Sequence, residues 1–304
     1  MATLAIGSTR NDWPLYGAVL AIGAVTDAVC RFYPAELPFW MPWEFSWPVY
    51  LATTMTLAWF WRGWSLVAER PAPWRAACFV LGVLSFYAVL QTHLDYYAQH
   101  MFFVHRWAHF VLHHAGAFFI ALGMSGPVLR AGMPSVLLPL LDFKPLRRIV
   151  DVLQHPAIAP LLFVGLLYFW LLPAIHTRVM LDANLYDLMN WTMAVNGVMF
   201  WSLVLDSRAK PPARYSHLLR AAMILIIELP QMALGAILSL STTDYYPVYT
   251  ICGRIIAMTA LNDQHYGGLI VWLPGTLTSF AAMIAVLWTM RLNEEKAEHA
   301  SQSV

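Results

Sequence analysis

Charged residues are scarce in this chain. Only 12% of its 304 residues are Asp, Glu, Lys or Arg, 60% are hydrophobic, and the formal net charge at pH 7 is +1. A balance so close to neutral argues against a nucleic-acid surface, which needs clustered positive charge. A water-soluble fold of this length could not cover so many apolar side chains, and the mean hydropathy is +0.58. The composition therefore indicates a protein whose solvent is the lipid bilayer.

Motifs typical of redox, zinc and nucleotide sites are also missing. The sequence has no CxxC pair, no zinc-type Cys/His spacing and no glycine-rich phosphate loop. Its three cysteines, Cys30, Cys78 and Cys252, are scattered. We interpret them as packing residues, with a Cys30–Cys252 disulfide as the alternative. The first residues show neither a basic n-region nor a cleavage site, so the first apolar stretch is expected to remain as an anchor.

The chain does contain long apolar stretches, most of them near the length that crosses hydrocarbon. They lie near residues 15–31, 47–66, 76–95, 101–124, 157–176, 187–206, 218–241 and 267–290. The sequence thus predicts an all-α, polytopic membrane helical bundle with about eight transmembrane helices, or seven if the first, which Asp27 interrupts, is not a span. The shorter run 134–142 is broken by Pro139 and is predicted to lie at the interface. We expect one integral membrane domain over 1–304, with a mobile charged tail at 292–304.

The basic residues predict the orientation of these spans. Most of them precede the first span, follow the second, fourth and sixth, or lie in the tail: Arg10; Arg62, Arg70 and Arg75; Arg130, Lys144, Arg147 and Arg148; Arg208, Lys210, Arg214 and Arg220; Arg291 and Lys296. An even number of spans places all of these segments on one side, which the positive-inside rule makes the cytoplasm. Both termini of this multi-pass protein are then predicted to be cytoplasmic.

The fourth apolar stretch carries an unusual stripe of side chains. Met101, His105, His109 and His113 recur every four residues, and on a helix each such step turns only about 40° beyond a full turn. Ionisable side chains inside a span are rare and usually functional. Imidazole and thioether together are a ligand set that suits copper. The stripe therefore predicts a copper-handling site.

The spacing also indicates how such a site is built. His105 and His109 can share one metal ion, whereas the whole stripe climbs about 18 Å and cannot. We predict a site at this pair with His265 as third ligand, Met101 as the first ligand on the way in, and His113 as a deeper second stop. Such a ladder suits transfer of copper rather than storage.

Polar side chains from five regions are predicted to converge on the outer face. They are His93 and Asp95; His100, His105 and His109; His176; Tyr186, Asp187 and Asn190; and Asp244 with the run Asn262 to His265. Asp95 and Asp263 are more plausible as groups that orient an imidazole than as copper ligands, because imidazole is favoured over carboxylate by Cu(I). Asp187 is predicted either to cap its helix or to take part in function.

Several motifs in the same order resemble the CtaG-like (caa3-type) cytochrome c oxidase assembly factors, over roughly residues 85–290. They are Asp95 with His105-x-x-x-His109, Gly123 and Pro127; His155-Pro156; Trp170-Leu-Leu-Pro173; the Asp187 region ending in Phe200-Trp201; Pro230-x-Met232-x-x-Gly235; and Asp263-Gln264-x-x-Gly267-Gly268-Leu-Ile-x-Trp272-x-Pro274-Gly275. The last is the strongest match.

The resemblance implies a bacterial inner-membrane protein that helps to mature a haem–copper oxidase by handling copper on the periplasmic face. It implies cytochrome c oxidase subunits, and a periplasmic copper chaperone, as partners. By position it makes functional residues of His105, His109, Asp95, Asp187 and Asp263. The role is assembly, so the chain is expected not to be an enzyme.

The sequence also departs from the family pattern. Histidine is common in the family at the positions of Leu171, Tyr186 and Asn190, while His113 and His265 stand where methionine and glutamine are more frequent. A rearranged ligand set is one consequence. A variant that has lost the metal but kept a partner-binding role is the other.

Three functions of other classes compete with this interpretation. A membrane di-iron enzyme would need several histidine boxes, and one cluster dominates here. A b-type haem could be ligated by His105 or His109 with His265. A copper transporter should carry ligands through to the cytoplasmic side, and the sequence shows no polar column in spans five to eight that would match the stripe.

Overall fold

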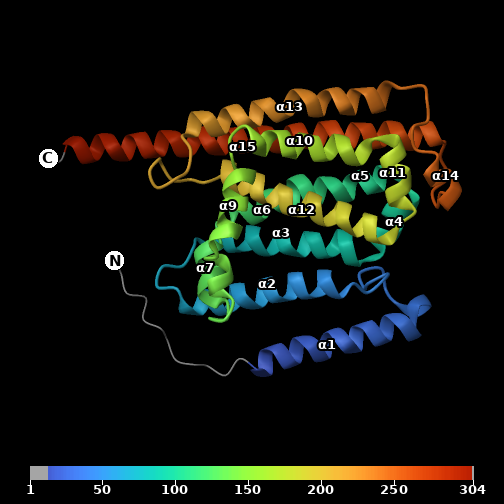
Figure 1. Ribbon diagram of the computed structural model, residues 1–304, viewed down its shortest axis with the longest axis horizontal. Coiled ribbons are helices and arrows are strands. Elements are labelled where there is room, and N and C mark those ends of the chain that lie inside the picture. The colour runs from blue at the N-terminus through green and yellow to red at the C-terminus, as the bar shows by residue number, and fades with distance from the viewer. Residues whose placement is uncertain (1–12, 303–304) are drawn as a thin grey trace.

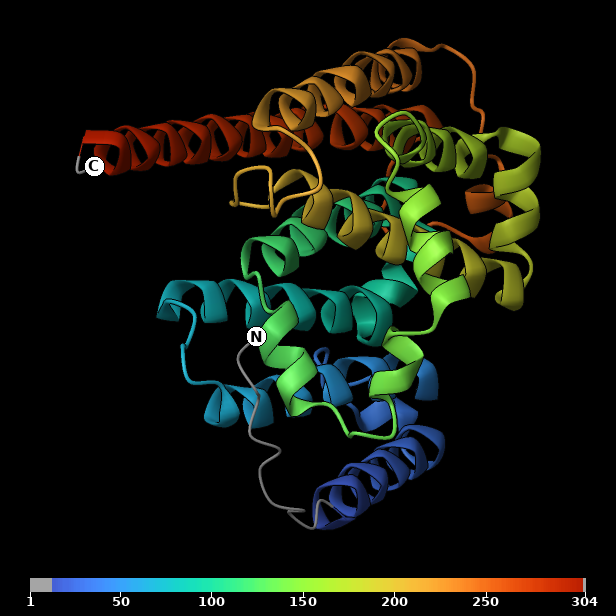
Figure 2. The same ribbon diagram turned by 60° about the vertical axis from the view of Figure 1, so that its left-hand side comes forward.

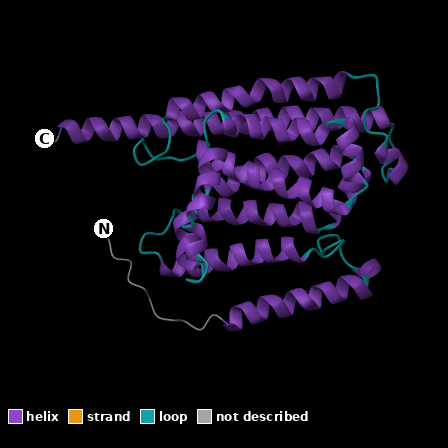
Figure 3. Cartoon of the chain, viewed as in Figure 1, coloured by secondary structure: helices purple, strands orange, loops and turns teal. Residues whose placement is uncertain are grey.

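The computed structural model describes residues 13–302, and within them the chain is helical with no strand beyond an isolated bridge between Pro42 and Thr92 (Figure 3). The helices are α1 (Trp13–Phe32), η1 (Pro34–Glu36), α2 (Trp47–Leu66), α3 (Pro73–Gln91), α4 (His93–His100), α5 (Phe102–Phe110), η2 (Val111–Ala115), α6 (Gly116–Leu122), α7 (Gly126–Gly132), α8 (Leu138–Leu141), α9 (Lys144–Leu153), α10 (Ile158–Leu171), α11 (Pro173–Met180), α12 (Ala183–Val204), α13 (His217–Leu240), α14 (Val248–Cys252) and α15 (Ala260–Gln302). The predicted all-α bundle is confirmed.

The predicted spans coincide with a long helix or with the continuous run α5–η2–α6, except that the stretch 157–176 is divided at Leu172 into α10 and α11. These elements lie side by side and roughly antiparallel, with α1 at one edge and α13 at the other (Figure 1, Figure 2). The run α5–η2–α6 is central, because α3, α12 and α15 all pack against it. The side chains on that run that face these helices are therefore shielded from lipid, while Trp107 on its outer side is exposed.

Length and composition identify fewer spans than the predicted eight. In the described residues four helices are long and apolar enough by themselves, namely α1, α3, α13 and α15, and the count reaches six if two bent pairs are each one span. α2 and α12 have 20 and 22 residues, about the length that crosses a bilayer, but polar residues lower their hydropathy. The number eight stays a prediction.

Short helices cover the two ends of the bundle. At one end lie α4, α11 and α14, and at the other lie α7 and α9 (Figure 1). The run α5–α6 meets α7 at 79°, and α9 meets α10 at 75°, so α7 and α9 turn away from the long helices. The basic linkers thus lie opposite the end predicted to face outward. Which end faces the cytoplasm stays a prediction, and Arg10 lies outside the described residues.

The segment 292–302, predicted to be a mobile tail, continues α15, which runs unbroken for 43 residues to Gln302. That helix is about twice as long as a bilayer needs. Cys30, Cys78 and Cys252 are all free, so the alternative disulfide does not form.

Glycines let the long helices approach closely. A Cβ atom on Gly235 would lie 2.5 Å from Cβ of Trp272, and one on Gly268 would lie 2.6 Å from the backbone nitrogen of Ser239. Small residues at such crossings are the usual means of packing helices in membranes, where apolar burial itself gives little drive. The α13–α15 pair therefore depends on Gly235 and Gly268.

We predict that Gly268→Ala destabilises the protein by about 1–3 kcal/mol, because the added methyl group has no room beside the α13 backbone. The measurement is the thermal unfolding midpoint in detergent. Gly165→Ala is the matched control, since nothing lies within 4 Å of its Cβ position. Equal midpoints for the two variants would contradict this account of the crossing.

Candidate functional site

The stripe of histidines lies inside the bundle. His105, His109 and His113 are all buried, and the rings of His105 and His109 are 4.4 Å apart between centroids. The predicted pairing of these two imidazoles, one helical turn apart, is therefore present. Both ring nitrogens of His105 and the Nδ1 atom of His109 lack a hydrogen-bond partner. Unpaired buried polar atoms of this kind are costly and suggest that a ligand can be received here.

The helix that carries the stripe changes its winding at η2. The backbone N–H of Gly116 donates to the carbonyl of Val111, which is the i→i+5 bond of a π-helix. The extra residue in this turn rotates the following side chains inward, so His114 is buried beside His113, with ring centroids 5.4 Å apart. His114 does not follow the four-residue spacing of the stripe. Single π turns occur frequently at functional sites.

Helix α12 stabilises this turn. The indole N–H of Trp201 donates to the carbonyl of His113 over 2.9 Å. Gly197 allows the approach, because a Cβ atom there would lie only 2.8 Å from the same carbonyl oxygen. The side chain of His113 is fixed as well: its Nε2 atom donates to Oδ1 of Asn196 over 3.1 Å, and its ring stacks on Phe163.

A third imidazole reaches the pair from α11. Pro173 begins that short helix after the chain breaks at Leu172, and His176 lies with its ring 5.2 Å from that of His105. Its Nδ1 atom donates to the carbonyl of Trp170, and its Nε2 atom accepts from the hydroxyl of Tyr249, each over 3.0 Å. The sequence placed His176 at the outer end without assigning it to the site. The sequence feature that could have indicated this position is Pro173, which begins α11 after the break at Leu172.

Two residues of α12 face the pair of histidines. Oδ1 of Asn190 accepts from Nε2 of His109 over 3.2 Å, and the ring of Tyr186 lies 5.8 Å from that of His105. These are two of the positions where the family resemblance leads one to expect histidine. Their place in the structure means that a change there alters the site directly.

Asp95, on α4 just beyond the end of α3, contacts Tyr186 of α12. Its carboxylate accepts from the hydroxyl of Tyr186 and from Nε2 of Gln99, each over 2.8 Å. Burial raises the pKa of Asp95 to about 6, although these two hydrogen bonds act in the opposite direction. Asp95 therefore orients Tyr186 rather than an imidazole.

Asp263 holds the helix that bears the stripe. Its carboxylate accepts from the backbone N–H groups of Phe102 and Phe103, over 3.1 and 2.9 Å, at the first turn of α5. It also pairs with Arg254 over 3.1 Å. Gly267, one turn further along α15, contacts Phe102 so closely that a Cβ atom would lie 2.2 Å from the ring. Asp263 thus caps α5; none of these partners is an imidazole, and a role in orienting one stays a prediction.

Three other predicted site residues differ in position or partner from the sequence-based expectation. His265 donates from Nε2 to the carbonyl of Ser241 over 2.8 Å, on the side of α15 that faces α13, because two residues after Asp263 a helix has turned by about 200°. Met101 is buried but has extended backbone between α4 and α5, so it is not on the helical stripe. Asp187 is exposed, and Asp182 caps α12 in its place.

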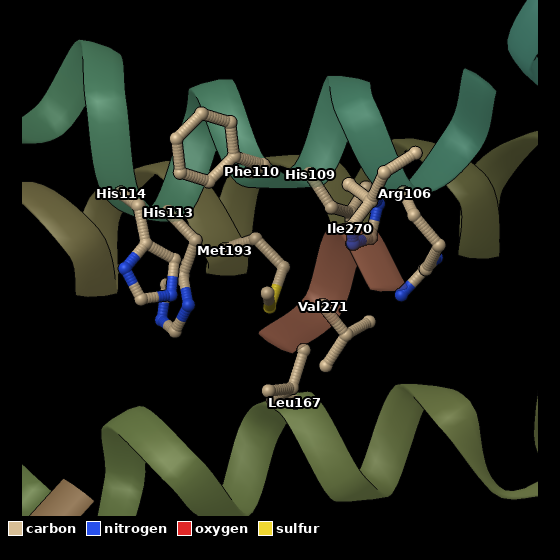
Figure 4. Close-up of a pocket in the computed structure, with 9 residues that line it drawn as sticks. All are labelled: Arg106, His109, Phe110, His113, His114, Leu167, Met193, Ile270 and Val271. Carbon is tan, nitrogen blue, oxygen red and sulfur yellow. The ribbon is translucent and has the colours of Figure 1, made fainter. Parts of the chain in front are cut away.

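A small cavity of about 20 Å³ lies beside the stripe (Figure 4). Arg106 and His109 lie at one end of it and His113 and His114 at the other, with Leu167, Met193 and Val271 along its sides (Figure 4). It is far too small for a haem macrocycle, so the b-haem alternative gains no support. Within the described residues no three His, Cys, Asp or Glu side chains already form a metal-binding cluster.

Comparison with protein families decides which family the chain represents. The profile of the cytochrome c oxidase caa3 assembly factors (Caa3_CtaG) matches residues 50–292, from α2 into the last helix. The chain belongs to this family. No curated protein and no solved structure gives a significant match.

Membership confirms the family resemblance of the sequence motifs and extends it toward the N-terminus as far as α2. The role of a caa3 assembly factor is to help form a cytochrome c oxidase, which makes the oxidase the partner. The expectation that this assembly factor is not itself an enzyme stays a prediction. Helix α1, which packs against α2, precedes the matched residues.

We predict that Asp263→Ala destabilises this assembly factor by about 3–5 kcal/mol, because it leaves Arg254 buried without its partner and uncaps α5. Thermal unfolding in detergent is the measurement. Asp187→Ala removes an exposed carboxylate of the same type and is expected to leave the midpoint unchanged. A stable Asp263→Ala protein would refute the capping role.

Proposed function

We propose that this caa3-type assembly factor binds cuprous copper at His105 and His109, with His176 as the third imidazole, and delivers it to an oxidase subunit. The observation that carries the proposal is the pair of imidazoles buried one turn apart in a membrane-spanning helix, in which both ring nitrogens of His105 and Nδ1 of His109 lack a partner. Two histidines at this spacing can share one metal ion. Their nitrogen atoms suit copper.

The charges around the pair favour a monovalent ion. The guanidinium of Arg106 is buried next to both imidazoles and repels a second positive charge. A divalent ion would meet twice the repulsion and a larger desolvation cost. Neutral imidazole ligands with Cu(I) give the smallest buried charge that the proposed ligand set allows.

Tyr249 supports an exchangeable third ligand. Its hydroxyl donates to Nε2 of His176, and Sδ of Met180 lies 3.8 Å from the same oxygen as a second acceptor. The hydroxyl can therefore turn to the thioether and free the imidazole without losing every partner. This movement takes place at the end of the bundle that α4, α11 and α14 cover, where we expect the oxidase subunit to dock. By the positive-inside rule that end is periplasmic.

Translocation of copper is a second candidate, because a further row of polar side chains follows the stripe. Between α13 and α15 lie Gln231, Glu228, Thr276 and Ser279, and Oε1 of Gln231, Oε2 of Glu228 and Oγ of Ser279 lack partners. The sequence-based expectation that spans five to eight hold no matching polar column is therefore wrong. An intramembrane carboxylate such as Glu228 is a functional candidate by default.

We predict that the purified wild-type protein, loaded with Cu(I) and washed, retains close to one copper per chain. His105→Ala/His109→Ala is expected to lose it, because two of the three proposed ligands are gone. Copper content by elemental analysis is the measurement. His265→Ala is the control. This variant is expected to retain the metal, since His265 bonds to Ser241 and is not a proposed ligand. Retention of copper by the double variant, or no copper in the wild type, would refute the proposed site.

We predict that cells with His105→Ala/His109→Ala express the assembly factor normally but contain oxidase with reduced copper and activity. Glu228→Gln separates the two candidates. Delivery at the outer face leaves oxidase copper unchanged in this variant, whereas translocation through the bundle lowers it together with cellular copper. Normal oxidase copper in the double histidine variant would exclude both functions at these residues.

A further inference from the structure

Arg106 is a positive charge inside the bundle, and no described residue supplies its counter-charge. It is 2% exposed, and its Nε, Nη1 and Nη2 atoms all lack a hydrogen-bond partner. Its guanidinium lies over the ring of Phe102, 5.2 Å from the centroid, which is a weak contact for a full charge. A guanidinium cannot give up its proton to escape this situation. Something anionic is therefore required beside it.

The carboxylates of the protein do not meet this need. Asp263 is occupied by Arg254 and by two backbone N–H groups of α5. Asp95 accepts from Tyr186 and Gln99, and Glu228 accepts from Thr276. Among the described residues, no carboxylate forms an ion pair or a hydrogen bond with Arg106.

The cavity of about 20 Å³ provides space for a small ion next to this charge. Holding one water molecule takes about 10–15 Å³ by the same measure. The walls contributed by Leu167, Met193, Ile270 and Val271, from α10, α12 and α15, are apolar. Such walls exclude bulky anions and strengthen the attraction between a guanidinium and a small one.

His105 adds a further unmatched donor near Arg106. A neutral imidazole carries a hydrogen on one ring nitrogen, and both nitrogens of His105 are without a partner. Nδ1 of His109 and of His113 is likewise unpaired, but it is an acceptor, because Nε2 of each ring carries the hydrogen that it donates to an asparagine. The unpaired N–H groups of Arg106 still outnumber these lone pairs, and an excess of donors around one buried cation is the pattern of an anion site.

We propose that Arg106 binds a halide-sized monovalent anion in this cavity, independently of any metal. The anion neutralises the guanidinium and completes its hydrogen bonds. This inference goes beyond the copper proposal, since the anion is needed even in the metal-free protein. With the anion bound, the neighbouring imidazoles also face a neutral pair in place of a bare cation.

The test uses the full-length protein in detergent after treatment with a copper chelator. Chloride is the probe. Gluconate, an anion too large for the cavity, is the comparison at equal ionic strength. Chloride is expected to raise the unfolding midpoint with a logarithmic dependence on concentration, as for any ligand of the folded state. Broadening of the chloride-35 resonance by the protein reports binding directly. In Arg106→Gln both effects are expected to disappear.

Arg254→Gln is the matched control, because it removes another largely buried guanidinium, one that already has Asp263 as its partner. It is expected to keep the chloride response. If Arg106→Gln does not accumulate, Arg106→Lys keeps the charge but loses the planar fork, and a weakened chloride response is expected. Equal responses to chloride and gluconate in the wild type, or a full response in the Arg106 variant that accumulates, would overturn the proposal. Copper content plays no part, so this outcome and that of the copper test are separable.

Discussion

The capping of α5 by Asp263 is the interaction on which the rest of the site depends. A helix that starts inside an apolar bundle exposes its first N–H groups where no water can satisfy them. Asp263 accepts from two of these groups and is itself neutralised by Arg254. The start and rotation of α5 are fixed in this way from a helix more than 150 residues away, and with them the direction of every histidine on the stripe.

The π turn of η2 has a comparable effect at the other end of the stripe. It brings His114 inward beside His113, and α12 compensates the altered backbone through Trp201 and the close approach at Gly197. The polar interior is therefore longer than a single stripe. It begins at His105, passes the π turn and continues toward Glu228, so that binding near His105 and movement through the bundle become distinct, testable functions.

The buried charge of Arg106 places a limit on any cation that binds here. A copper site beside an uncompensated guanidinium would pair two positive charges in an apolar surrounding, and electrostatic repulsion of this kind is strong where water is excluded. A small anion at Arg106 relieves the repulsion. The proposed anion and the proposed copper ion are therefore energetically linked, although each can be measured without the other.

The sequence by itself determined the membrane helices, the family and the pairing of His105 with His109, because apolar length and four-residue spacing are local properties. Tertiary structure decided the third imidazole, the capping role of Asp263 and the inward position of His114. His265 was a reasonable expectation that failed, since the rotation of α15 is set by its packing against α5 and α13 and not by its own residues. Contacts between distant helices, which leave no periodic signal in a single chain, determined the remainder of the site.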